Sequence, residues 1–193
     1  MALNWQKQIQ MSKVYAGLDW SMSSPGLAIG NTNFDEIQFF GIRKKKKQAS
    51  SSKQIILLEE PLYSCNAERF YKLAELYVKI LLAHNVEHVF IEGYAMGAVG
   101  AVFDIGECTG IMKHVMWING ITFEPFAPTS IKKFATGKGN SKKSDMFSHF
   151  VTKTNWRMDH AIDDPIVNLE KIPSPINDCV DAYWILQYGL SLQ

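Results

Sequence analysis

Apolar residues along the chain follow two spacings, which together predict an α/β fold. Strands are predicted where apolar residues are consecutive or alternate and where glycine, proline or polar residues bound them: 13–19, 26–32, 35–42, 87–93 and 121–128. Helices are predicted where apolar residues recur at three- and four-residue steps: 67–84, 103–118, 141–153 and 177–190. The apolar run at 53–60 predicts a further extended segment or a continuation of the same sheet.

The order of these elements predicts one domain built on a mixed five-stranded sheet with helices on both faces. Short turns separate the first three strands, which are therefore expected to be antiparallel neighbours. The contiguous apolar residues of 87–93 predict a central strand that is covered on both faces. Residues 1–12 are polar and aperiodic and are expected to form a loose N-terminal arm, while 13–193 form the single domain.

Two finer expectations concern the helix at 103–118 and the segment at 159–175. Gly106 and Gly110 are expected to bring that helix into close packing. Met112, Met116 and Trp117 are expected in the core, with a homodimer face as the alternative. The acidic, proline-containing segment 159–175 is expected to be a loop.

Composition excludes several classes of protein. The chain has 193 residues, of which 47% are hydrophobic, so it can bury a substantial core. No apolar run approaches the roughly 18 residues that span a bilayer, and the N-terminus lacks the apolar block of a signal peptide. The three cysteines are far apart, which argues against a disulfide scaffold or a cysteine-based zinc module and favours a reducing, cytoplasmic compartment.

Basic residues gather in two runs, although 20 basic and 19 acidic residues leave a net charge of only +1. The runs are 43–53, RKKKKQASSSK, and 131–144, IKKFATGKGNSKKS. Either run alone is typical of a solvated loop, but two runs in a neutral chain favour a phosphate-facing surface. The candidate DNA contacts are Arg43, Lys44, Lys45, Lys46, Lys132, Lys133, Lys138 and Lys142.

Four acidic residues are candidates for a metal site. Asp19 and Glu92 end two of the predicted strands, and Asp178 and Asp181 lie three residues apart on one face of the last helix. Individually they have ordinary explanations, such as capping a turn or a helix N-terminus. If the last helix packs beside the two strands, however, the four carboxylates converge and repel one another. Mg²⁺ or Mn²⁺ would relieve that repulsion, and two such ions suit phosphodiester hydrolysis.

Five motifs in order resemble those of RuvC-type Holliday junction resolvases: GLDWSMSSPGLAI, FIEG, FDIGECTG, APTSIKKFATGKGNSKKSDM and NDCVDAYWI. The resemblance extends from residue 13 to about residue 190, and it implies a ribonuclease H-like fold. It implies that Asp19, Glu92, Asp178 and Asp181 bind two Mg²⁺ or Mn²⁺ ions and that Lys143 is the catalytic lysine.

The same resemblance gives roles to further residues and leaves some positions open. Lys142 replaces Lys143 as the catalytic lysine if the alignment shifts by one position. Close approach of the DNA backbone would occur at Gly137 and Gly139. Trp20 stands where the family has a small residue or proline. Ala95 stands where the family often has an aromatic wedge, which leaves Tyr94 or Met96 as the replacement.

The activity implied is resolution of four-way DNA junctions by paired nicks that leave 5′-phosphates. Because each chain supplies one site and a junction needs two nicks, the resemblance also implies a homodimer, in a bacterium or a bacteriophage-infected cell and with no membrane partner. Two alternatives remain open: a ribonuclease H-type or flap and fork nuclease of the same fold, and a non-catalytic protein that binds junctions.

Overall fold

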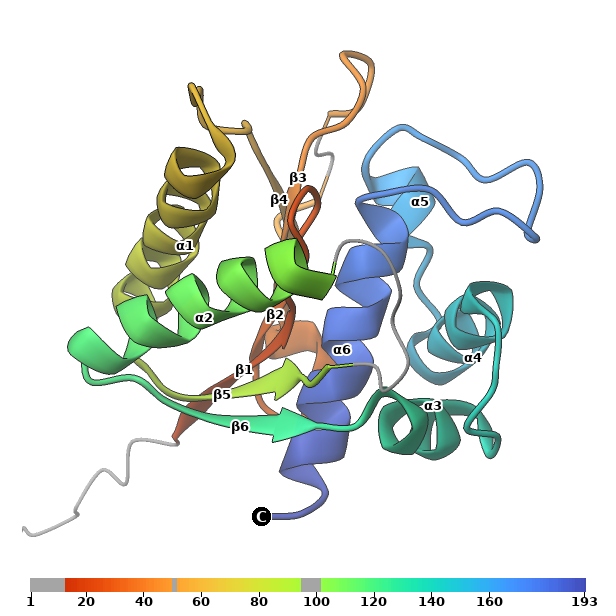
Figure 1. Ribbon diagram of the computed structural model, residues 1–193. Helices are drawn as coiled ribbons and strands as arrows, with labels where there is room; N and C mark the ends of the chain where they lie inside the picture. Colours follow the sequence, from red (N-terminus) through yellow and green to blue (C-terminus); the bar gives the residue numbers. More distant parts are fainter. Residues whose placement is uncertain (1–12, 50–51, 95–101) are drawn as a thin grey trace, which may run out of the picture.

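A computed structural model describes residues 13–49, 52–94 and 102–193, which contain a mixed six-stranded sheet (Figure 1). The strands, in chain order, are β1 (Val14–Asp19), β2 (Gly26–Gly30), β3 (Gln38–Ile42), β4 (Ile55–Leu58), β5 (Val86–Glu92) and β6 (Thr122–Phe126). Their spatial order is β4-β3-β2-β1-β5-β6. The first three strands form the predicted antiparallel meander, and β5 and β6 continue the sheet in parallel with β1.

The sheet has one strand more than the five predicted from the sequence. The additional strand is β4, which pairs in parallel with β3 at the sheet edge, from Phe39 opposite Ile55 to Ile42 opposite Leu58. Ile55 is fully buried, whereas Ile56 is partly exposed. A run of four apolar residues carries too little periodic signal to separate an edge strand from a continued segment.

Helices cover both faces of the sheet, as predicted. They are α1 (Asn66–Ala83), α2 (Val102–Ile118), α3 (Pro128–Thr136), α4 (Lys143–Thr154), α5 (Met158–Ala161) and α6 (Ile176–Leu190), with a short 3₁₀ helix at Phe34–Glu36. Ile91 of β5 packs in the core with α1 and α2, and its neighbour Phe90 packs in the core with α3, α4 and α6. Consecutive side chains of β5 thus point to opposite faces of the sheet, as expected for a strand that helices cover on both faces.

Two of these helices were not predicted from the sequence. One is α3, which overlaps the start of the second basic run, and the other is α5, which overlaps the start of the predicted loop at 159–175. Both are short, so few apolar residues mark their period. Among the described residues, no helix combines the length and apolar character needed to cross a membrane.

The prediction of close packing through Gly106 and Gly110 was wrong. Among the described residues, a Cβ atom added at either glycine would meet nothing within 4 Å. Met112 and Met116 are buried as expected, but Trp117 was wrongly assigned to the core, because 71% of it is exposed. The exposed side of α2 therefore carries both the glycines and an indole ring.

Close packing through glycine occurs instead between the sheet and α6. A Cβ at Gly17 of β1 would lie 2.2 Å from the carbonyl oxygen of Ala182, and one at Gly26 of β2 would lie 2.1 Å from that of Asp178. The backbone of α6 therefore rests directly on β1 and β2. This contact brings the first turns of α6 to the ends of the central strands.

Candidate active site

The acidic residues predicted from the sequence come together at one end of the sheet. Asp19 and Glu92 are the last residues of β1 and β5, which are parallel neighbours with Leu18 opposite Ile91. Parallel strands place their carboxyl ends at the same edge, where open α/β sheets hold their ligands. Asp178 and Asp181 reach this edge from the first turns of α6.

Three of the four acids line a single cavity of about 150 Å³ together with two lysines. Its charged walls are Asp19, Glu92, Asp181, Lys132 and Lys143, and the remaining walls are apolar side chains of α3, α4 and α6: Ile131, Met146 and Ile185. Asp178 is buried beside it. The cavity thus combines partly buried carboxylates with ammonium groups, of which that of Lys143 is exposed to solvent.

Burial and mutual repulsion disfavour the charged forms of these carboxyl groups. Burial raises the pKa of Asp19 well above its ordinary value, and the charges of Asp181, Glu92 and Asp178 raise it further. Burial also raises the pKa of Glu92, against the attraction of Lys132 and Lys143. The pKa of Asp181 rises to about 7, chiefly through burial. The cluster therefore holds more negative charge than its lysines neutralise.

Ser24 holds the carboxyl group of Asp178, and no role was predicted for it from the sequence. Its Oγ donates a hydrogen bond of 2.6 Å to Oδ2 of Asp178, and both residues are buried. The turn that carries Ser24 is itself held from α1, where the hydroxyl of Tyr77 donates to the carbonyl oxygen of Pro25. The only signal for this residue was its place in the motif SMSSPG.

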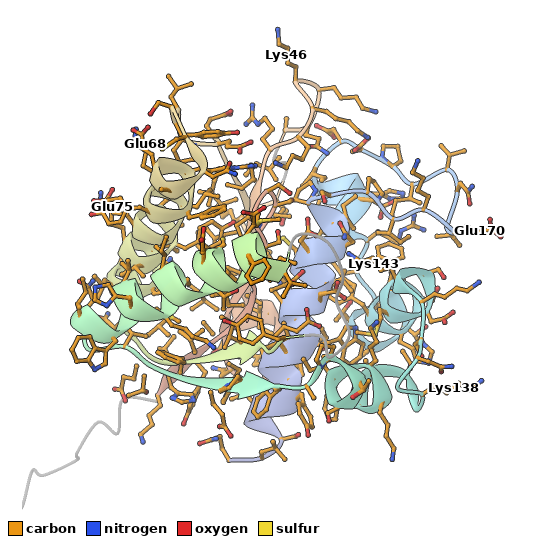
Figure 2. The ribbon with its side chains drawn as sticks, viewed as in Figure 1. Lys46, Glu68, Glu75, Lys138, Lys143 and Glu170 are labelled. Atoms are coloured by element: carbon orange, nitrogen blue, oxygen red, sulfur yellow. The ribbon has the colours of Figure 1, made fainter. Side chains whose placement is uncertain are left out.

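Lys143, rather than Lys142, faces the acidic cluster. It is the first residue of α4, it lines the cavity, and its Nζ lies 3.7 Å from Oδ2 of Asp181. Figure 2 shows its side chain beside α6. Lys142 is exposed and precedes the helix, with its backbone N–H donating to Oδ2 of Asp145.

The donor chemistry of the cluster fits a hard divalent cation such as Mg²⁺ or Mn²⁺. Its donors are carboxylate oxygens, and a cation would offset the repulsion that raises the pKa of Asp19. In the described parts of the chain, however, no three His, Cys, Asp or Glu side chains are arranged to hold an ion as they stand. The carboxylates are therefore gathered but do not form a closed coordination shell.

The first basic run is largely engaged with carboxylates of the chain itself. Buried Asp164 forms ion pairs with Lys45 and Lys47, whose Nζ atoms lie 2.7 Å and 2.8 Å from its carboxylate oxygens. Arg43 pairs with Glu59 at 3.3 Å, and Lys44 pairs with Glu60 at 3.5 Å. Lys46 extends outward from the loop (Figure 2) and has no ion pair among the described residues.

The second basic run has a different character. Lys132 and Lys133 lie on α3, while Lys138 and Lys142 lie between α3 and α4; in the described parts of the chain none of them forms an ion pair. Gly137 ends α3 with φ of 82°, a left-handed conformation that favours glycine. At Gly139 an added Cβ would lie 3.2 Å from the carbonyl oxygen of Thr129.

The candidate wedge positions are described only in part. Tyr94, two residues beyond the end of β5, is half-exposed, and Nζ of Lys113 lies 5.1 Å from its ring centroid. Ala95 and Met96 lie outside the described residues. Among the described residues, Tyr94 is therefore the candidate for the aromatic wedge.

The sequence matches no protein-family model and no curated protein, but solved structures share its fold. Thermus thermophilus RuvC in complex with a Holliday junction substrate matches with a TM-score of 0.62 and 13% identity, over 93% of this chain and 96% of that chain. The yeast mitochondrial Holliday junction resolvase Ydc2 gives 0.54 and 10% identity, over 91% and 77%. Fowlpox virus resolvase in complex with substrate Holliday junction DNA gives 0.50 and 15%, over 93% and 97%.

These likenesses show that the chain has the ribonuclease H-like fold of the Holliday junction resolvases, which confirms the fold class predicted from the sequence. At such low identities they show the fold alone. The chemistry must be argued from the residues at the ends of β1 and β5.

Proposed function

We propose that the chain is a metal-dependent, structure-selective nuclease, a crossover junction endodeoxyribonuclease that resolves four-way DNA junctions. The observation that carries this proposal is the gathering of Asp19, Glu92, Asp181 and Lys143 around one cavity. The T. thermophilus and fowlpox virus proteins of the same fold were determined with Holliday junction DNA. Branched DNA is therefore the proposed partner, in the cytoplasm of a bacterium or a bacteriophage-infected cell.

The proposed reaction is in-line hydrolysis of one phosphodiester bond. Asp19, Glu92, Asp178 and Asp181 would hold two Mg²⁺ or Mn²⁺ ions, which would supply the Lewis acidity that activates water and stabilises the leaving oxygen. The oxygen of one water would form a bond to phosphorus as the bond from phosphorus to the 3′ oxygen breaks, and one proton of that water would pass through solvent to the 3′ oxygen, so that the products are a 3′-hydroxyl and a 5′-phosphate. Lys143 Nζ offsets the charge that develops on the phosphate.

Two nicks in one junction require two sites, and the exposed side of α2 supports a homodimer. Phe103, Gly106, Gly110 and Trp117 follow helical spacing along one side of α2, and the two aromatic side chains are 86% and 71% exposed. Gly110 lies midway between the aromatic residues in sequence. A two-fold axis near Gly110 would therefore set Phe103 of one copy against Trp117 of the other, with the glycines at the crossing.

Junction cleavage tests the enzymatic proposal. A labelled four-way junction is incubated with Mg²⁺ or Mn²⁺ beside linear duplex, flap and RNA–DNA hybrid, using wild type and Asp19→Asn. Paired nicks with 5′-phosphates in the junction alone, lost in the variant, are expected. Preference for the hybrid or flap would assign a different nuclease of the same fold, and binding without cleavage would assign a scaffold.

Sedimentation velocity tests the dimer. Trp117→Glu places a charge in the proposed interface and should convert a dimer to a monomer while leaving single nicks possible. Leu82→Glu, which alters a partly exposed apolar residue of α1, is the matched control and should remain dimeric. A dimer that persists in Trp117→Glu would exclude this face of α2.

A further inference from the structure

A second, larger cavity lies against the acidic cluster on its other side. It has a volume of about 570 Å³, and Asp19 and Glu92 line both this cavity and the smaller one. Its other walls are mainly apolar and come from the turn after β1, the end of β5 and the start of α2; they include Trp20, Met22, Tyr94, Val102, Ile105 and Thr109. A large apolar space thus adjoins the proposed site of phosphate chemistry.

Trp20 gives this cavity a fixed wall. Its side chain is only 9% exposed, and its Nε1 donates a hydrogen bond of 3.1 Å to the carbonyl oxygen of Cys108 in α2. Its ring meets that of Tyr77 edge to face, with the centroids 5.7 Å apart. The indole is therefore held from both α1 and α2, and its single donor is already satisfied within the protein.

We propose that this cavity binds one unstacked nucleobase of the strand being cut, next to the scissile phosphate. Sites for flat aromatic ligands are concave and mainly apolar, with a few polar groups at the edge, and flipped bases bind in pockets of this kind. Here Trp20 and Ile105 supply apolar wall, and Ser21 and Thr109 supply hydroxyl groups. This inference rests on the proposed function, because the phosphate would be held by the cations proposed for the acidic cluster.

Asp19 and Glu92 line both cavities, and this shared position favours a nucleobase as the occupant of the larger one. A phosphate bound through cations on these two residues would place the neighbouring nucleotides of its strand at the mouth of the larger cavity. Bases at a branch point cost less to unstack than bases within a duplex, so a junction can supply one. Tyr94 also lines the cavity, and its half-exposed ring can stack on a base.

The experiment is a scan of junctions in which one base at a time around the scissile phosphate is replaced by an abasic site. With wild-type protein, one position should lower the single-turnover cleavage rate about tenfold, the order expected for the loss of one base–aromatic contact. The other positions should cleave at nearly the normal rate. If wild type cleaves every abasic junction equally, the cavity holds no base and the inference is overturned, while the nuclease proposal stands.

A cavity-filling variant locates the sensitive base in this cavity. Ile105 is 37% exposed, and Ile105→Trp fills the space without altering a metal-site residue. It should cleave the intact junction about as slowly as wild type cleaves the sensitive abasic junction, with no further loss when both changes are combined. Ile56→Trp, the same change on β4 at 39% exposure and outside the cavity, should behave as wild type.

The outcomes separate the two proposals. If wild type cleaves no junction, the proposed function fails before the cavity is in question. If losses from the abasic site and from Ile105→Trp simply multiply, the sensitive base binds elsewhere and the inference fails alone. Should Ile105→Trp not fold, as judged by circular dichroism, Thr109→Phe provides a second filling variant, and the wild-type scan remains decisive.

Discussion

At the scale of single residues, the contact between Ser24 and Asp178 joins positions 154 apart in the sequence. The hydroxyl donates to one carboxylate oxygen, Oδ2, and so sets the direction in which the other oxygen points. Hydrogen bonds to charged groups contribute about 1.5–3 kcal/mol when buried. Ser24 would therefore be a positioning residue for Asp178, a proposed metal ligand.

Ser24→Ala should lower kcat for junction cleavage about tenfold and leave KM nearly unchanged, because it removes orientation rather than DNA contact. The concentration of Mg²⁺ needed for half-maximal rate should rise as well. Ser148→Ala, at an exposed serine of α4, is the control. If Ser24→Ala alters thermal stability but neither kcat nor the Mg²⁺ requirement, the contact is structural only.

Asp164 provides a residue-scale prediction about pH. Burial alone would raise its pKa, but hydrogen bonds from Lys45, Lys47 and Gln48 outweigh that effect and lower the pKa to about 2. A carboxyl group with a lowered pKa stabilises the fold above its ordinary pKa, and this stabilisation disappears as pH falls through the folded value. The relevant window is therefore about pH 4 to pH 2.

Between pH 5 and pH 2, wild type should lose about 1–2 kcal/mol more unfolding free energy than Asp164→Asn, a range that allows for the partial exposure of the lysines. Urea denaturation at each pH measures the difference. Parallel pH dependence in the two proteins would show that the lysine contacts do not stabilise the charged carboxylate.

At the scale of elements, the packing of α6 on β1 and β2 explains why the acidic cluster forms. Gly26 allows the backbone of α6 to approach at Asp178, one of the proposed metal ligands. Gly26→Ala should lower the unfolding free energy by about 1–3 kcal/mol through overpacking and should lower kcat by displacing the first turn of α6.

Gly106→Ala is the stability control for that substitution. Both substitutions are made in the Trp117→Glu variant, the proposed monomer in which Gly106 would face no second copy. Among the described residues the added methyl group then meets nothing within 4 Å, so the unfolding free energy should rise by about 0.5–1 kcal/mol. Thermal unfolding and single-turnover cleavage of the two variants measure these opposite effects. Equal stability of both variants would contradict the close contact between β2 and α6.

Element-scale features also show what sequence could and could not predict. Asp19, Glu92 and the two acids of α6 were identified because they end strands or begin a helix, where topology alone brings them together. The role of Ser24 was not predicted, because a hydrogen bond between residues far apart in the sequence leaves no local periodic signal. Trp117 was misassigned because an aromatic residue within an apolar helix has the same pattern whether it faces a core or solvent.

At the scale of the whole molecule, the net charge does not show which basic side chains are free to bind DNA and which are paired with carboxylates of the chain. Both basic runs were predicted as DNA contacts on composition, and only tertiary structure distinguishes them. In the first run, Lys45 and Lys47 are held by Asp164. In the second, Lys132, Lys133, Lys138 and Lys142 form no ion pair among the described residues, and Lys132 lines the smaller cavity beside Asp19 and Glu92.

This difference predicts how junction affinity depends on salt. Each phosphate contact contributes about 0.9 to the slope of log affinity against log salt concentration, because a bound counterion is released. Lys138→Ala should therefore reduce the slope by about 1 and weaken binding to all DNA shapes alike. Lys45→Ala should leave the slope unchanged and lower protein stability instead, since this ammonium group is already paired with Asp164.

Fluorescence anisotropy of labelled junction across a salt series measures both slopes, with Ca²⁺ in place of Mg²⁺ to prevent cleavage. If Lys45→Ala reduced the slope as much as Lys138→Ala, the contact with Asp164 would have to open when DNA binds. The segment after α5 would then be released from the basic loop upon binding, and the loop would contribute to the interface. A slope reduced by Lys138→Ala and unchanged by Lys45→Ala would instead place a DNA contact on the α3–α4 side of the acidic cluster, beside Lys143, and exclude Lys45 as one.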